Sequence, residues 1–255
     1  MKSSTPRTTS APRSAARPAT PAAGKAAGAL RPSARRAREP FADQAYRDLR
    51  ARILDNRMPS GEQYTEAELA ALLHMSRTPT REAMLRLASE GLVEVRPRHG
   101  MRVKPVSTVD MREIYEVLTA LESTAAALAA ARADHGDAIR QLRAAISDMD
   151  AALASDDLPA WAAADERFHT LLVAAAGNRR LSELVQTYVG QSHRVRMQTL
   201  RLRPKPLTSN RDHESVVDAV EAHDAARARE IHYAHREQSG RMLVELLARH
   251  GLTQL

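Results

Sequence analysis

The chain has 255 residues, 43% of them hydrophobic, which is enough to build one or two globular domains with buried cores. It contains no cysteine, so disulfides and thiolate metal sites are excluded and any metal must be held by His, Asp or Glu. No run approaches the roughly 18 apolar residues that span a bilayer, and the N-terminus lacks the apolar segment of a signal peptide, so we expect a cytoplasmic protein without membrane association.

The first 40 residues differ in composition from the rest. They are rich in Pro, Ala, Ser, Thr and Arg and carry nine basic residues against one acidic residue, which more than accounts for the net charge of +7. Such a segment cannot bury enough apolar surface to offset its ordering entropy, so residues 1–40 are predicted to be a disordered basic tail. Salt-sensitive affinity for DNA is one interpretation; a solvated extension, a mistaken start or a transit-like segment are others.

The next segment, 41–104, is predicted to form a small domain that begins with two helices. Apolar residues at helical spacing indicate the first helix over 42–55. Thr65 followed by Glu68 makes a capping box that begins the second helix, whose buried stripe includes Leu72.

A third helix that runs directly into a basic hairpin is the most informative feature of this domain. The helix begins at Ser76 or Thr78, and strands are predicted at 92–95 and 101–103. Seven basic residues stand against three acidic ones in 75–104. Because side chains of a first helical turn can reach base edges and phosphates together, the pattern is typical of DNA binding. For the helix alone, a solvated arginine face is the alternative.

Residues 105–255 show only helical patterns, six in all, which predict an antiparallel bundle. Ser107 with Asp110 caps the first of these helices, and Pro204 and Pro206 separate the fourth from the fifth. The predicted fold class is therefore mainly α: a winged helix-turn-helix over 41–104, followed by an all-α antiparallel helical bundle.

Four polar residues interrupt the apolar faces of this bundle in the same way: Asp165, His169, His213 and His235. A lone buried carboxylate would cost several kcal/mol, so a carboxylate gathered with three imidazoles makes physical sense if a divalent cation neutralises it. The alternative is a set of separately hydrogen-bonded core histidines plus an Asp, and His232 competes with His235 for the fourth position.

The stretch ILDNRMPSGEQYTEAELAALLHMSRTPTREAMLRLASEGLVEVRPRHGMRV resembles the winged helix-turn-helix of the GntR family of bacterial transcription regulators. The resemblance implies DNA contacts in the recognition helix and at the wing tip from Ser76, Arg77, Thr78, Thr80, Arg81, Arg98, His99 and Gly100. Arg77 and Arg81 would contact bases or phosphates, and Thr78 and Thr80 would anchor phosphates. His74 stands where the family usually has Gly, so it is expected to adopt the left-handed conformation.

The segments DERFHTLLVAAAGNRRL, RDHESVVDAV and IHYAHREQ resemble the all-helical FCD ligand-binding domain of FadR-like GntR regulators. The resemblance implies that Asp165, His169, His213 and His235 bind a divalent metal, Zn, Ni or Mn, which an N/O donor set does not distinguish. It also implies that the metal helps to hold an effector, often a small organic acid. Leu118 stands where the family often has an Arg; Arg194 or Arg196 could supply the effector-binding charge instead, the alternative being a solvated arginine face.

These features together predict a homodimeric, metabolite-responsive transcription regulator, a repressor on a near-palindromic operator, and not an enzyme. One alternative is a metal-free regulator whose helical domain binds an acyl chain or serves only for dimerisation. A more distant alternative is a metal-dependent hydrolase, although no Glu, Ser or Lys is spaced as a partnered general base or nucleophile.

Overall fold

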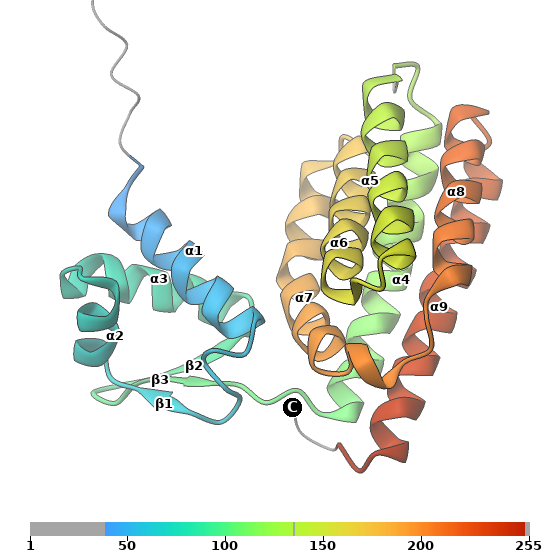
Figure 1. The fold of residues 1–255 in the computed structure, drawn as a ribbon. Helices are drawn as coiled ribbons and strands as arrows, with labels where there is room; N and C mark the ends of the chain where they lie inside the picture. The colour runs from blue at the N-terminus through green and yellow to red at the C-terminus, as the bar shows by residue number, and fades with distance from the viewer. Residues whose placement is uncertain (1–38, 135, 253–255) are drawn as a thin grey trace, which may run out of the picture. The chain divides into compact units, whose positions relative to one another are not determined.

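The computed structural model describes residues 39–134 and 136–252 (Figure 1). The predicted tail over 1–40 lies outside the described residues except for its last two positions. Within these two ranges no helix combines the length and the apolar character that a membrane crossing requires. The described chain is helical apart from one small sheet near its beginning.

Three helices open the fold, as the sequence predicts: α1 (Phe41–Leu54), α2 (Glu66–Leu73) and α3 (Arg77–Ser89). The capping box at the start of α2 is confirmed, since the Thr65 hydroxyl accepts from the Glu68 amide and the Glu68 carboxylate accepts from the Thr65 amide. His74 ends this helix at φ 52°, in the left-handed region, also as expected.

A three-stranded antiparallel sheet follows, with the order β1-β3-β2. The predicted hairpin consists of β2 (Val93–Arg96) and β3 (Gly100–Val103), whereas β1 (Gln63–Tyr64) was not predicted because two residues show no alternation. Gly100 has φ 84°, and a Cβ there would lie 2.0 Å from the Tyr64 carbonyl oxygen. Glycine is therefore required where β1 passes the start of β3.

The core of this first part is built from the inner faces of the three helices and the sheet. Leu49, Ile53, Leu69, Leu87 and Met101 are among its fully buried members. The prediction that Leu72 is buried is wrong: its side chain is 40% exposed, because the buried face of α2 is centred between Leu69, Ala70 and Leu73, and Leu72 lies about 100° from that centre.

Six helices make up the remainder of the described chain, the number that the sequence predicts. They are α4 (Thr108–Ala130), α5 (Gly136–Ala154), α6 (Leu158–Ala175), α7 (Arg179–Gln198), α8 (Leu207–Glu221) and α9 (Ala225–Arg249), with a short 3-10 turn, η1 (Leu200–Leu202), between α7 and α8. The two longest, α4 and α9, pack along each other, as do α5 and α6 (Figure 1). The predicted Ser107–Asp110 capping box begins α4.

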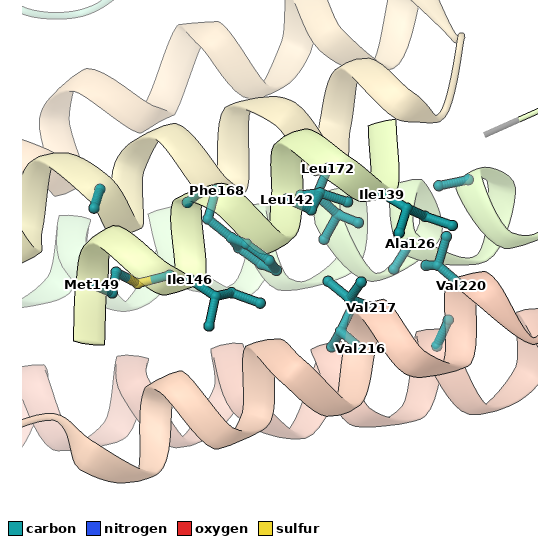
Figure 2. Packing of buried hydrophobic residues seen from close by; sticks show 14 of the residues in the cluster. Ala126, Ile139, Leu142, Ile146, Met149, Phe168, Leu172, Val216, Val217 and Val220 are labelled. Atoms are coloured by element: carbon teal, nitrogen blue, oxygen red, sulfur yellow. The ribbon is translucent and has the colours of Figure 1, made fainter. Parts of the chain in front are cut away.

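The bundle has a layered apolar core (Figure 2). Leu142 and Ile146 of α5 meet Phe168 of α6 and Val216 and Val217 of α8, and all five are buried. Burial of an aliphatic side chain of this size contributes roughly 1.5–3 kcal/mol. This packing fixes the rotation of α6 and α8, so that their polar residues Asp165, His169 and His213 also point inward.

Candidate functional site

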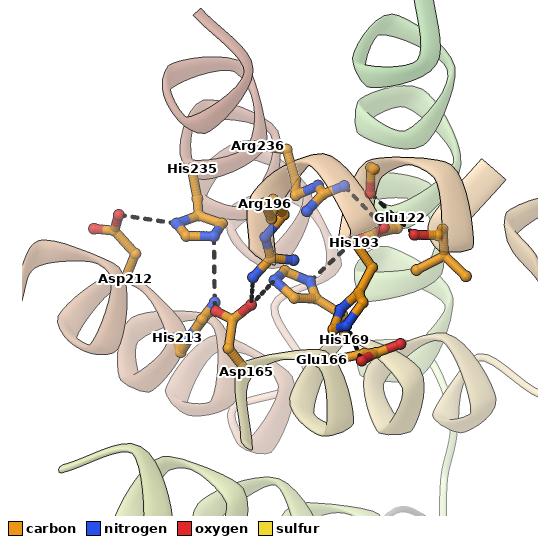
Figure 3. A network of polar contacts seen from close by, with 12 residues as sticks. Glu122, Asp165, Glu166, His169, His193, Arg196, Asp212, His213, His235 and Arg236 are labelled. Atoms are coloured by element: carbon orange, nitrogen blue, oxygen red, sulfur yellow. Dashed lines mark hydrogen bonds and ion pairs between the residues drawn. The ribbon is translucent and has the colours of Figure 1, made fainter. Parts of the chain in front are cut away.

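The four residues singled out in the bundle come together in the structure (Figure 3). Asp165 and His169 project from α6, His213 from α8 and His235 from α9, and all four are buried. The Nε2 atoms of His213 and His235 lie 3.2 Å apart. Asp165 lies 3.8 Å from His169 Nε2 through one carboxylate oxygen and 3.8 Å from His213 Nε2 through the other.

Two neighbouring carboxylates orient two of the imidazoles. The Nδ1 atom of His235 lies 3.1 Å from Asp212 Oδ2, and the Nδ1 atom of His169 lies 2.9 Å from Glu122 Oε2. A protonated Nδ1 facing a carboxylate leaves Nε2 with a free lone pair. His213 is oriented differently, because its ring stacks on Phe168 with centroids 4.1 Å apart. All three Nε2 atoms consequently face a common point beside Asp165.

The protonation states of these groups follow from their burial and their neighbours. Burial, and then the charge of His235, lowers the pKa of His213 well below its ordinary value, and burial also lowers the pKa of His235. For Asp165 burial by itself would raise the pKa, but Arg196 and the surrounding imidazoles outweigh it and hold the pKa below its usual range. Near neutral pH the centre therefore offers the neutral imidazoles of His213 and His235 and the ionised carboxylate of Asp165.

This donor set fits a divalent cation. Three imidazole nitrogens and one carboxylate are ligands of Zn, Ni and Mn, and no thiolate is required. Two nitrogens that are each bound at about 2.1 Å stand roughly 3.0–3.4 Å apart for ligand angles between 90° and 109°. The observed His213–His235 separation of 3.2 Å lies in that range. His169, His213 and His235 each offer a ligand atom within 4.8 Å of the others.

His232 takes a different place from His235. It is fully buried, and its Nε2 lies 3.2 Å from Glu122 Oε2, while Arg236 lies 3.3 Å from the other oxygen of the same carboxylate. Glu122 was not predicted as part of the site. It was detectable as an acidic residue on an otherwise apolar stripe of α4, between the buried positions Leu118 and Ala126.

A cavity of about 210 Å³ opens beside Asp165, His169 and His235. Its wall also contains four basic side chains, which come from α7, from the link between η1 and α8, and from α9: Arg196, Arg203, Lys205 and Arg236. Trp161 forms part of the apolar wall, and its Nε1 donates to Asn210 Oδ1 at 2.9 Å. A small hollow with apolar walls and converging cations suits a small anionic ligand.

The two arginines proposed for effector binding differ in position. Arg196 lines the cavity and donates from Nη2 to the Asp165 carboxylate. Arg194 is not part of the cavity wall: it is buried elsewhere and donates from Nη2 to the carbonyl oxygen of Lys104 at 2.5 Å. Two residues along a helix differ by about 200° in direction, which separates them. The alternative of a solvated arginine face is wrong for both, since both side chains are buried.

The expected DNA-contacting residues lie at the start of α3 and at the turn between β2 and β3. Ser76, Arg77, Thr78 and Arg81 are exposed, and so are Arg98 and His99 at the tip of the hairpin. Gly100 forms the first position of β3, where its role is conformational.

Thr80 does not fit the expectation of a phosphate anchor. Its side chain has no exposed surface, and its hydroxyl donates to the Ser76 carbonyl oxygen at 3.0 Å. One helical turn separates Thr80 from Ala83 and Met84, which face the core, so Thr80 packs on the same side. It stabilises the first turn of α3 and presents nothing to a phosphate.

Comparison with known families agrees with this two-part arrangement. Residues 41–103 match the family described as bacterial regulatory proteins, gntR family, and residues 113–238 match the FCD domain. The first match contains the three helices and the sheet, and the second contains all four convergent donors and most of the cavity wall.

Individual relatives are regulators of transcription. An uncharacterized HTH-type transcriptional regulator in the TAR-I ttuE-ttuC' intergenic region of Agrobacterium vitis is 48% identical over 134 residues, covering 52% of this chain and 78% of the relative. The HTH-type transcriptional repressor RspR of Escherichia coli K12 is 26% identical over 186 residues, covering 73% and 81%. Among solved structures, E. coli McbR/YncC shares the fold with a TM-score of 0.70 at 21% identity, covering 81% of this chain and 98% of that one. The chain therefore belongs to the GntR family of bacterial transcription regulators and carries an FCD domain, so it is a DNA-binding regulator and not the hydrolase weighed as an alternative.

Proposed function

We propose that this protein is a homodimeric transcription repressor of the cytoplasm whose helical domain binds a divalent metal and a small organic acid, and whose winged helix binds a near-palindromic operator. The observation that carries the proposal is the convergence of Asp165, His169, His213 and His235 beside a cavity lined by arginines. A regulator that only dimerises has no need of such a buried polar centre, which is costly to form without a ligand.

The exposed side chains at the start of α3 support the DNA-binding half of the proposal. Arg77 and Arg81 are exposed one turn apart and carry the fixed fork of donors that pairs with guanine edges or phosphates. Arg98 and His99 extend from the hairpin tip and are suited to the adjacent minor groove. In a dimer, two such surfaces would contact two half-sites that lie about one turn of the DNA helix apart.

The buried centre supports the effector-binding half. Asp165, His169, His213 and His235 would hold the cation, and a bound Zn, Ni or Mn ion supplies a Lewis-acid centre with open positions that a carboxylate can fill. Glu122 and Asp212 face Nδ1 of His169 and His235, which orients Nε2 of each ring toward the proposed cation. Arg196 adds a positive charge to the same cavity. An anion that binds one state of the dimer more tightly than the other shifts its affinity for DNA.

Four measurements on untagged full-length protein test the proposal. Elemental analysis is expected to find a transition metal that chelation removes, and light scattering is expected to find a dimer. Selection from random duplexes is expected to enrich a near-palindromic sequence. A thermal-shift screen of organic acids, with and without the metal, is expected to find an acid that raises Tm only in its presence and weakens binding to the selected duplex. A protein without affinity for any divalent metal would refute the metal centre, and acids that tighten DNA binding would refute repression relieved by effector.

A further inference from the structure

Asp165 contacts Arg196 through its carboxylate in this structure and is also a ligand of the proposed cation. Its carboxylate accepts from the Arg196 guanidinium, and both side chains are buried. The same carboxylate is the acidic member of the proposed metal centre. Arg196 and a divalent cation would compete for the same two carboxylate oxygens. Binding of the cation to Asp165 therefore weakens the ion pair between Asp165 and Arg196.

Arg203 is a second cation in the same cavity, and it has no carboxylate partner among the described residues. Its Nη2 donates to the Arg196 carbonyl oxygen at 3.2 Å, and its Nε is buried without a hydrogen-bond partner. Burial, and then the neighbouring charge of Arg196, lowers the pKa of Arg203 to about 10. A guanidinium in this position is costly unless an anion approaches it.

The other basic side chains of the cavity wall are already neutralised. Lys205 lies 2.7 Å from Asp156, and Arg236 lies 3.3 Å from Glu122. Once Asp165 is assigned to a divalent cation, Arg196 and Arg203 remain beside that cation as two positive charges, neither of them within 4.0 Å of another carboxylate of the described residues. A ligand with a single negative charge would leave this part of the cavity with an excess of positive charge.

We infer that Asp165 exchanges Arg196 for the divalent cation, and that Arg196, once released, binds together with Arg203 an acid that carries at least two carboxylates. The inference rests on the proposed metal centre. The cavity volume of about 210 Å³ lies below the roughly 300–1,000 Å³ typical of drug-sized ligands, which restricts the acid to a few carbons. Trp161, Leu158 and Leu200 supply apolar wall for the carbon chain.

The exchange is tested with metal alone. Ni²⁺ binding is measured by calorimetry on metal-free wild type, Arg196→Gln and the control Arg201→Gln, which removes an exposed arginine from η1. Removal of the competitor is expected to raise the Ni²⁺ affinity by about 5- to 100-fold in Arg196→Gln, within the usual span of couplings between sites, and to leave it unchanged in the control. An unchanged affinity, or a loss of about 10- to 100-fold as for a residue that supports a metal ligand, would overturn the exchange.

The acid is tested with matched pairs of ligands on the Ni²⁺-loaded protein. Malonate, succinate and L-malate are compared with propionate, butyrate and β-hydroxybutyrate, which lack one carboxylate each, and Trp161 fluorescence in the cavity wall reports binding. At least one diacid is expected to bind about tenfold more tightly than its partner, within the usual span of coupling between binding groups. Arg203→Gln is expected to abolish this difference while the variant still binds Ni²⁺.

The outcomes separate this inference from the proposed function. A wild type that binds no Ni²⁺, Zn²⁺ or Mn²⁺ refutes the metal centre and the inference with it. A wild type that binds metal, but binds every diacid no better than its monoacid, refutes the inference and leaves the metal centre intact. Circular dichroism checks the fold of each variant, and Arg203→Met replaces Arg203→Gln if the latter does not fold. Retention of the diacid preference in the folded uncharged variant contradicts the role of Arg203.

Discussion

The Nε2 atoms of His213 and His235 face each other at 3.2 Å in the interior of the bundle, although they belong to different helices, α8 and α9. The Nδ1 atom of His235 contacts the Asp212 carboxylate, and the ring of His213 stacks on Phe168. Both rings are therefore fixed before any ligand arrives. A pair of preoriented imidazoles costs little reorganisation on metal binding, which favours high affinity.

His213→Ala is expected to remove most of the metal affinity, because it deletes one of the three imidazoles that converge on the proposed centre. The matched control is His250→Ala, which removes an exposed histidine at the end of α9. At a metal concentration of about 100 times Kd, wild type and control should gain about 2.7 kcal/mol of stability, and His213→Ala should gain none. Chemical denaturation with and without the metal checks this. An equal gain in all three proteins would locate the metal elsewhere.

Arg81→Ala is expected to weaken binding to the selected operator by about 1–3 kcal/mol and to leave Tm unchanged, because its side chain is exposed at the start of α3. Arg140→Ala, which removes an exposed arginine of α5, serves as the control for a general loss of positive charge. Fluorescence anisotropy with a labelled duplex gives both affinities. Equal affinities of the two variants would refute a direct contact from Arg81.

Thr80→Val should lower stability and leave DNA affinity unchanged, the opposite of Arg81→Ala. The substitution keeps the shape of a fully buried side chain but deletes the hydrogen bond to the Ser76 carbonyl oxygen. A loss of about 0.5–1.5 kcal/mol in the free energy of unfolding is expected, with little change in the operator affinity of the folded protein. Urea denaturation and anisotropy measure the two quantities. If affinity falls while stability is retained, Thr80 contacts DNA after all.

His74→Gly is expected to stabilise the protein by about 1 kcal/mol, because residue 74 has φ 52° and a left-handed backbone costs a non-glycine residue about 1–2 kcal/mol. Ala71→Gly is the matched control, since it places glycine at an exposed position inside α2, where it should destabilise by about 1 kcal/mol. Thermal and urea denaturation report both changes. Destabilisation by both variants would mean that the His74 side chain makes a contribution that outweighs its backbone strain.

Stability of the metal-free protein is expected to fall as the pH is lowered from about 6.5. Burial lowers the pKa of His232 from the ordinary value of 6.5 to about 3, so between these values the unfolded chain takes up a proton that the folded chain does not. The slope approaches about 1.4 kcal/mol per pH unit for each such group. Urea denaturation at pH 7, 6 and 5 measures it. Constant stability across this range would show that His232 can be protonated in the folded protein.

Local chemistry was sufficient to predict the helices, two capping boxes and one pair of site residues. The capping boxes at Thr65 and Ser107 involve residues three positions apart, and Asp165 and His169 are neighbours on any helix because they are four apart. The left-handed conformation of His74 was expected because the family that the chain resembles usually has Gly at this position. Each of these features depends on contacts within a few residues, which the order of the amino acids determines directly.

Other features depend on which surfaces pack together, and only the tertiary structure decided them. The strand β1 exists because β3 pairs with it, and Thr80 is buried because the first turn of α3 meets the core. Glu122 lies 110 positions from its partner His232. Arg194 and Arg196 could not be separated by sequence, since the direction of each depends on how α7 is rotated against its neighbours. The amino-acid sequence thus determined the helices, the hairpin and the four candidate ligands, while long-range packing determined β1, the carboxylates that orient the ligands and the arginines that share their cavity.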